Sequence, residues 1–340
     1  MSSRCAIFWH DQSSVAKVFT MSVIVTGGAG FIGCNLVRKL LDLKEEVIVI
    51  DNLSSGRLRN LDGLKYKFAE MDLSKNDIVG NPVFEGVKRI YHLAANVDNR
   101  FSWQDPHFPI AQNISATMNV GLAAVKAGIP EIIYASTGTI YGEPIKPPPY
   151  NELEENSGQT SLYGATKYAG EGILSVFSHH HGIKVTVFRF VGVLGPFYSH
   201  GHVFDFVKRL IQNPALLQVL GDGTQRKSYV DVDDVVESIV KVSTSGNFEI
   251  FNLGRSDYSS VKESVKWVIQ EMGISPSVEY QDSPRGWIGD NPFLQLDVNK
   301  IESMGFTPTR SIEQSVRRTV RWLIENPWIL EGFDSSNMHR

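Results

Sequence analysis

The sequence is poor in cysteine and has no long uninterrupted apolar segment. Its 340 residues include two cysteines, Cys5 and Cys34, and neither lies in a CxxC motif or a cysteine–histidine cluster. Two isolated thiols cannot form a disulfide framework and are typical of a reducing compartment, so we expect a cytoplasmic protein. The first twenty residues contain Asp11 and Lys17 and lack the apolar core of a signal peptide or a membrane helix.

An excess of positive charge is also absent. The chain has 33 lysine and arginine residues against 37 aspartate and glutamate residues, a formal net charge of −4. This balance provides no basic surface for nucleic acid or for a membrane, so we expect neither partner. Apolar residues make up 42% and charged residues 21%, which is ordinary for a globular protein and excludes disorder, collagen and coiled coil.

Short β-branched runs alternate with amphipathic helices from Met21 onward, a pattern typical of a parallel sheet covered on both faces. We expect strands at Val23–Thr26, Val47–Ile50, Lys65–Ala69, Arg89–His92, Glu131–Ala135 and Lys184–Phe188, and helices at Ile32–Asp42, Asn113–Ala127 and Leu162–His181. The fold class is therefore α/β with a doubly wound parallel sheet. Residues 1–20 read as an extension outside the fold, 21–189 as the sheet domain, and 190–330 as a smaller, interleaved lobe that binds substrate.

A glycine-rich turn follows the first predicted strand and opens the first predicted helix. Gly27, Gly30 and Gly33 are spaced as in a Rossmann dinucleotide site, where they permit a tight turn and close approach to a pyrophosphate at a helix N-terminus. Asp51 ends the second strand, where an acid binds the adenosine ribose and repels a 2′-phosphate. This favours NAD over NADP, although an acid at that position can also cap a turn.

A possible catalytic group lies between the fifth and sixth strands. Tyr163 and Lys167 are four residues apart on one helix face, and Thr137 leaves the fifth strand. A phenol beside an ammonium can take the proton of a sugar hydroxyl while the carbon loses a hydride. The spacing alone is a weak signal, because Tyr258 and Lys262 repeat it without support, and hydroxyls such as that of Thr137 can also merely cap a turn.

Together these motifs, with His92-Leu93-Ala94-Ala95 and Tyr141-Gly142, resemble the extended short-chain dehydrogenases, most closely the nucleotide-sugar epimerases of the UDP-glucose 4-epimerase type. The resemblance covers Met21 to about Pro327. It implies an NAD site and a catalytic group of Tyr163, Lys167 and Thr137. The residues it implies for NAD, beyond the three glycines, are Phe31, Ile32, Asp51, Asn52, Ser54, Gly56, Asp72, Leu73, Leu93, Ala94, Ala95, Gln112, Asn113, Tyr163, Lys167 and Val191.

The residues after Thr137 distinguish between the reactions of this family. Dehydratases and decarboxylases carry an acid there, whereas this chain has Gly138 and Thr139, which cannot deliver a proton at neutral pH. We therefore expect epimerization at C4 of a nucleotide sugar through a 4-keto intermediate. An NAD-linked nucleotide-sugar reductase or dehydrogenase, and a non-catalytic NAD-binding protein, remain the alternatives.

The resemblance also implies substrate contacts. Arg226, in the Gly221–Arg226 turn, and Arg285 are candidates for binding the diphosphate, while Thr137 and Tyr163 contact the sugar. Leu294 takes a position that borders the C2 substituent, so we expect room for an N-acetyl group. Gly192 stands where the family usually has an Asn that helps to hold the substrate diphosphate. Because glycine lacks that side-chain donor, the identity of the sugar stays open.

The sequence favours no metal site, and it favours a homodimer by resemblance. Asp231, Asp233 and Asp234 fit a helix cap and contacts between lobes, and the consecutive His179–His181 cannot all face one metal ion. The dimer would pack the helices at 113–127 and 162–181 as a four-helix bundle. Small residues that could permit close approach are Ala116, Ala123, Ala124, Ala165 and Ala169.

Overall fold

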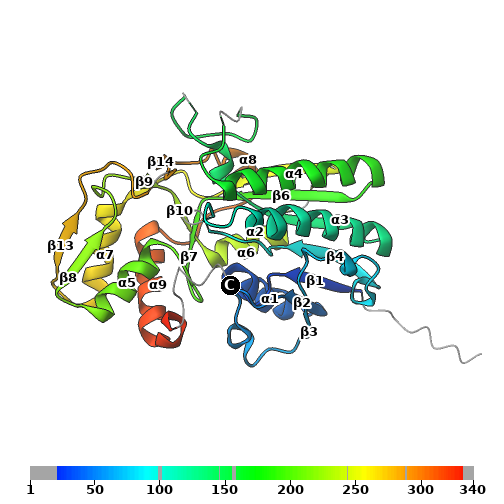
Figure 1. Cartoon of the computed structure of the whole chain (residues 1–340), viewed down its shortest axis with the longest axis horizontal. Helices are drawn as coiled ribbons and strands as arrows, with labels where there is room; N and C mark the ends of the chain where they lie inside the picture. The colour runs from blue at the N-terminus through cyan, green and yellow to red at the C-terminus, as the bar shows by residue number, and fades with distance from the viewer. Residues whose placement is uncertain are drawn as a thin grey trace, which may run out of the picture.

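The computed structural model describes residues 21–98, 102–144, 146–154, 158–242, 244–287 and 289–331 (Figure 1). The extension predicted at residues 1–20 lies outside the described residues. No helix in the described part of the chain is both long and apolar enough to span a membrane.

A parallel sheet of seven strands is the centre of the molecule, in the order β11-β6-β5-β4-β1-β2-β3. The strands are β1 (Ser22–Thr26), β2 (Val47–Asp51), β3 (Lys67–Glu70), β4 (Val87–His92), β5 (Glu131–Thr137), β6 (Lys184–Phe190) and β11 (Phe248–Leu253). Every residue of β1 and β2 is buried, as the continuous β-branched runs of a sheet covered on both faces require. The predicted α/β fold is confirmed.

Helices cover both faces of this sheet (Figure 1). The helices α3 (Ala116–Ala127) and α4 (Leu162–His181) pack on one face, and α1 (Phe31–Asp42) and α6 (Val232–Lys241) pack on the other. The helix expected from residue 113 is preceded by the short α2 (His107–Pro109) and a π-helical turn, η4 (Ile110–Ser115). Such π turns are frequent at functional sites, and this one carries Gln112 and Asn113.

The second half of the chain forms a smaller lobe beside the carboxyl ends of the strands, and it also contributes β11 to the central sheet. Its strands pair as β7 with β10, β8 with β13, and β9 with both β12 and β14. The elements are β7 (Gly192–Leu194), α5 (His202–Gln212), β8 (Leu216–Val219), β9 (Arg226–Lys227), β10 (Tyr229–Asp231), β12 (Ser259–Ser260), α7 (Val261–Met272), β13 (Ser277–Tyr280), β14 (Phe293–Leu294), α8 (Asn299–Ser303) and α9 (Ile312–Glu325).

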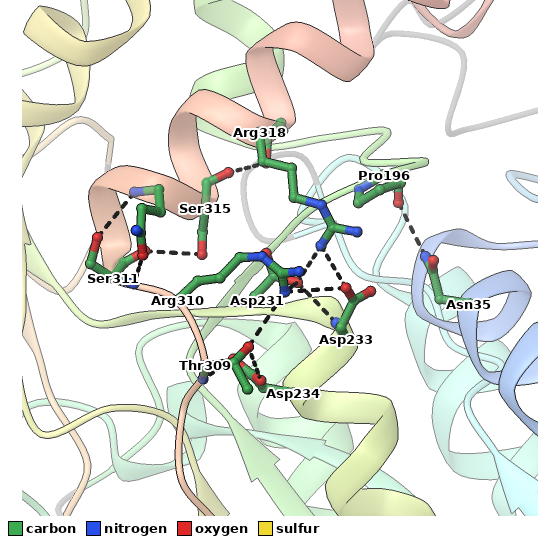
Figure 2. A network of polar contacts seen from close by, with 12 residues as sticks. Asn35, Pro196, Asp231, Asp233, Asp234, Thr309, Arg310, Ser311, Ser315 and Arg318 are labelled. Carbon is green, nitrogen blue, oxygen red and sulfur yellow. Dashed lines mark hydrogen bonds and ion pairs between the residues drawn. The ribbon is translucent and has the colours of Figure 1, made fainter.

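Acidic residues at the start of α6 tie this helix to α9 (Figure 2). Asp231 caps α6 by accepting a hydrogen bond from the backbone N–H of Asp233 at 3.0 Å, and it is fully buried. The guanidinium of Arg318 lies 2.6 Å from the same carboxylate, and Asp234 accepts from the Thr309 hydroxyl at 2.7 Å. These acids therefore act as a helix cap and as contacts within the fold.

Candidate active site

A cavity of about 520 Å³ lies between the carboxyl ends of the sheet strands and the second lobe. Ligands of open α/β sheets bind in this place. Most of the residues that the sequence predicts for the site line it: Gly27, Gly30, Phe31, Ile32, Gly33, Asp51, Asn52, Ser54, Gly56, Leu73, Leu93, Ala94, Ala95, Gln112, Thr137, Tyr163, Lys167, Val191 and Leu294. Asp72, Asn113, Arg226 and Arg285 are not part of its lining.

The glycine-rich turn has no room for a side chain at two of its glycine positions, Gly27 and Gly33. Gly27 has a φ of +66°, and a Cβ there would lie 2.8 Å from the Cα of Ala94. A Cβ on Gly33 would lie 2.7 Å from the Cα of Gly28. The helix α1 begins directly after Gly30 without a side-chain cap, so its first N–H groups are available to an anion. This cradle fits the pyrophosphate of a dinucleotide.

Asp51 supports the same turn from the end of β2. Its Oδ2 accepts from the N–H of Ala29 at 2.9 Å and its Oδ1 from the N–H of Leu53 at 2.8 Å. Burial raises the pKa of this carboxyl group. The carboxylate thus acts as a turn cap, and it also lines the cavity, where each oxygen retains a lone pair for a ribose hydroxyl.

Asp72 and Asn113 lie behind the cavity wall and hold residues that form it. Asp72 accepts a hydrogen bond from the side-chain amide of Gln112 at 3.1 Å. Asn113 is 1% exposed and binds the backbone N–H of Asn96 through its Oδ1 at 2.7 Å. Both residues therefore support the predicted cofactor site through the neighbours that they orient.

The three predicted catalytic residues meet in the cavity wall. Tyr163 and Lys167 occupy the first turns of α4, whose start is fixed by the Ser161 hydroxyl accepting from the N–H of Gly164 at 3.1 Å. Thr137 ends β5 and accepts at its hydroxyl oxygen from the N–H of Thr139 at 3.2 Å. The fold thus brings a phenol, an ammonium and a hydroxyl from two elements to one surface.

The surroundings shift the pKa values of both ionisable groups. Burial raises the pKa of Tyr163 to about 12, and a hydrogen bond with the hydroxyl of Thr137 acts in the opposite direction. Burial lowers the pKa of Lys167 to about 7, and the negative charge of Glu171 opposes this effect. The Lys167 ammonium also lies 4.0 Å from the ring centroid of Tyr134. The second pair with the same spacing, Tyr258 and Lys262, lies outside the cavity lining.

The two arginines predicted to bind the diphosphate have other partners. Arg226 is exposed, and its guanidinium lies 4.1 Å from the ring centroid of Phe293. Arg285 forms a bidentate ion pair with Glu143, with Nη2 to Oε2 at 2.9 Å, and donates to the backbone carbonyl of Asp290 at 2.8 Å. Neither guanidinium therefore faces the cavity.

Lys227, the residue after Arg226, lines the cavity instead. Successive strand residues face opposite sides, so only one of the two cations can point inward. The ammonium of Lys227 lies 2.5 Å from Oδ1 of Asp290, which is 3% exposed. The turn motif predicts Arg226 for the site, whereas the residue of this strand that lines the cavity is Lys227.

Sequence reasoning missed a further group of lining residues in the second lobe. These residues are His202, Gln225, Lys227, Tyr229 and Trp287. Gln225 is 2% exposed, and neither atom of its amide has a hydrogen-bond partner among the described residues. Alternate residues of an extended chain point to the same side, so this rule would have predicted that Gln225, Lys227 and Tyr229 share one face after the glycine turn. No feature of the sequence indicates His202 or Trp287.

Comparisons with known proteins show which family and which proteins this chain resembles. The model of the NAD dependent epimerase/dehydratase family matches residues 23–254. A UDP-glucose 4-epimerase of Mycolicibacterium smegmatis is 30% identical over 313 residues, which cover 89% of this chain and 98% of that protein. UDP-glucuronic acid decarboxylase 1 of Arabidopsis thaliana is 30% identical over 308 residues, which cover 88% of this chain and 69% of that protein. The crystal structure of a Thermotoga maritima UDP-glucose 4-epimerase with UDP-glucose has a TM-score of 0.83 and 30% identity, covering 90% of this chain and all of that one.

Proposed function

The chain belongs to the NAD-dependent epimerase/dehydratase family, and we propose that it inverts the C4 hydroxyl of a UDP-sugar. The family includes relatives with different reactions, so the proposal depends on the residues of the site. The observation that carries it is the meeting of Thr137, Tyr163 and Lys167 in a cavity where Thr137 is followed by Gly138 and Thr139. This wall has the groups for reversible oxidation of a hydroxyl and lacks an acid next to Thr137 for elimination.

Tyr163 is the proton acceptor in this reaction. Its phenolate takes the proton of the C4 hydroxyl and later returns it, while Thr137 holds the reacting oxygen by a hydrogen bond. The Lys167 ammonium favours the phenolate, which burial disfavours. NAD would be held by its pyrophosphate in the cradle of Gly27, Gly30 and Gly33, and it would supply the hydride acceptor for the C4 carbon and later return the hydride. The 4-keto sugar presents its other face before reduction, so the net reaction involves no oxidation.

The diphosphate of the substrate belongs beside Lys227, because this cation faces the cavity whereas Arg226 and Arg285 do not. Leu294 also lines the cavity, and we propose that it borders the sugar at C2. Leucine lacks the ring of a tyrosine, so an acetamido group fits. We expect UDP-N-acetylglucosamine to be turned over beside UDP-glucose.

The test is incubation of the purified protein with UDP-glucose, UDP-N-acetylglucosamine and UDP-glucuronate in separate reactions, followed by separation of the products. We expect the 4-epimers of both UDP-glucose and UDP-N-acetylglucosamine without added NAD. Heat-denatured protein should release NAD in about equal amount to the chain, because an epimerase retains its cofactor. Net production of NADH would show a dehydrogenase, and loss of carbon dioxide from UDP-glucuronate would show a decarboxylase; either result contradicts the proposal.

We also propose a cytoplasmic homodimer formed by α3 and α4. Met118 and Leu122 of α3 and Tyr168 and Val176 of α4 are large apolar side chains that are 40% to 55% exposed. Such residues on two adjacent helices favour burial against a second copy. The alanines of α3 do not contribute, since Ala116, Ala123 and Ala124 are at most 1% exposed and pack against the sheet.

A further inference from the structure

Gly192 and Tyr229 are coupled across two paired strands of the second lobe. They are partners in the parallel register of β7 and β10, and both line the cavity. A Cβ on Gly192 would lie 2.6 Å from Cε1 of Tyr229 and closer still to Cδ1. The ring of Tyr229 therefore occupies the space that any side chain at position 192 would need.

His202 packs on this ring from α5. The two ring centroids are 4.8 Å apart, and Phe206 meets the imidazole edge-on at 5.7 Å. The Nε2 atom of His202 is buried and has no hydrogen-bond partner within the described ranges. A polar atom left unpaired in a cavity wall is satisfied most simply by the ligand of that cavity.

Lys227, a cation that lines this part of the cavity, is already paired with a carboxylate, so a bound diphosphate needs further hydrogen-bond donors. Lys227 precedes Tyr229 by two residues, so both side chains face the cavity. Asp290 already neutralises the Lys227 ammonium at 2.5 Å. A diphosphate with two negative charges therefore needs hydrogen bonds beyond this one ion pair.

We propose that the hydroxyl of Tyr229 and the imidazole of His202 form a neutral hydrogen-bonding subsite for the diphosphate of the substrate. This inference rests on the proposed function, which supplies the diphosphate. Both groups are neutral near pH 7: burial raises the pKa of the Tyr229 phenol, with Asp290 adding to the effect, and burial lowers the pKa of His202 to about 3, with Lys227 adding to it. The phenol therefore retains its O–H, and the neutral imidazole retains one N–H that can be donated. Gly192 belongs to the subsite because only glycine admits the ring.

The first experiment measures binding of UDP and of uridine by calorimetry to the purified protein with its NAD. Tyr229→Phe removes one hydroxyl and keeps the ring. It should raise the Kd of UDP about 3- to 10-fold, the effect of one hydrogen bond, while the Kd of uridine, which has no phosphate, stays the same. His202→Phe should act in the same way. Tyr258→Phe is the control, because Tyr258 is 43% exposed and lies outside the cavity lining.

The second experiment tests the coupling. Gly192→Ala should weaken UDP binding by displacing the ring, but it should have no further effect in a Tyr229→Ala protein. Gly172→Ala is the matched control, since a Cβ there would meet nothing within 4 Å. NAD content and melting temperature should stay unchanged in the Tyr229→Phe protein, which separates a ligand contact from a folding defect.

An unchanged Kd of UDP for Tyr229→Phe, an equal loss for uridine, or additive effects of Gly192→Ala and Tyr229→Ala would each overturn the subsite. These results are separate from the proposed function. If wild-type protein fails to epimerize UDP-sugars but shows the expected UDP effects, the subsite stands and 4-epimerization fails. If it epimerizes UDP-sugars and Tyr229→Phe changes neither the Kd of UDP nor the KM of the sugar, the subsite fails and the reaction stands.

Discussion

Replacement of Tyr163 by phenylalanine is the most direct test of the catalytic assignment. Burial raises the pKa of the phenol to about 12, so at pH 7.5 the phenolate is disfavoured by roughly 6 kcal/mol before Lys167 and the cofactor act on it. Phenylalanine cannot accept a proton at all. We expect Tyr163→Phe to lower kcat about 10³-fold, or about 4 kcal/mol in the barrier, with little change in KM.

The assay is conversion of UDP-galactose to UDP-glucose, with NAD content and melting temperature measured on the same samples. The variant loses one hydrogen bond with Thr137, so its melting temperature should fall by a few degrees at most. Tyr258→Phe removes a phenol that has the same spacing to a lysine and lies outside the cavity, and it should keep full activity. If the Tyr163→Phe enzyme retained more than a tenth of wild-type kcat, Tyr163 would not be the base.

The remaining predictions address the cofactor, the sugar, the assembly and the pH dependence. Asp51→Asn removes the charge that repels a 2′-phosphate, so the ratio of NADP to NAD affinity should rise about tenfold in titrations of cofactor-stripped protein; an unchanged ratio would make Asp51 a turn cap alone. Leu294→Tyr should lower kcat/KM for UDP-N-acetylglucosamine about 10- to 100-fold and spare UDP-glucose, because ring bulk at C2 discriminates by about 1–3 kcal/mol. Leu122→Glu places a charge on the exposed α3 surface and should shift the mass in light scattering from dimer to monomer; a monomeric wild type at micromolar concentration would refute the interface. His92 has a pKa lowered to about 3 by burial, so the unfolded chain binds the extra proton and stability falls by about 1.4 kcal/mol per pH unit below pH ~6.5; His92→Gln should reduce that slope in urea titrations at pH 7 and pH 5.

Strands β1, β2 and β6 could be predicted from the sequence because they are buried on both faces and consist largely of β-branched and aromatic residues. The strand that was missed, β11, lies at the sheet edge, and its first three residues are only partly buried. It carries Glu249 and Asn252, so its composition does not indicate a buried strand. An edge strand has one neighbour, and the selection for apolar residues is correspondingly weaker.

The cofactor half of the site could also be anticipated, because a tight turn against a pyrophosphate demands glycine at fixed spacing. A Cβ at Gly27 or Gly33 would collide with backbone, so the sequence pattern follows from geometry. The substrate half is different. Lys227 was missed in favour of Arg226 because the orientation of a two-residue strand depends on its pairing with β12 and β14, which are far away in the sequence.

The packing around Thr137 gives a structural reason for the absence of an acid there. A Cβ on Gly138 would lie 3.3 Å from both Cδ atoms of Leu296 and from the backbone carbonyl of Phe190. A side chain at this position would need Leu296, which is 1% exposed and belongs to the main core cluster, to shift by a few tenths of an ångström, and a carboxylate there would lie against it. Burying a charge against an apolar side chain without a partner costs several kcal/mol. Leu296 of the second lobe therefore packs at the position where an elimination reaction would need a proton donor. This packing favours the proposed reaction, in which Tyr163 is the group that accepts and returns the proton.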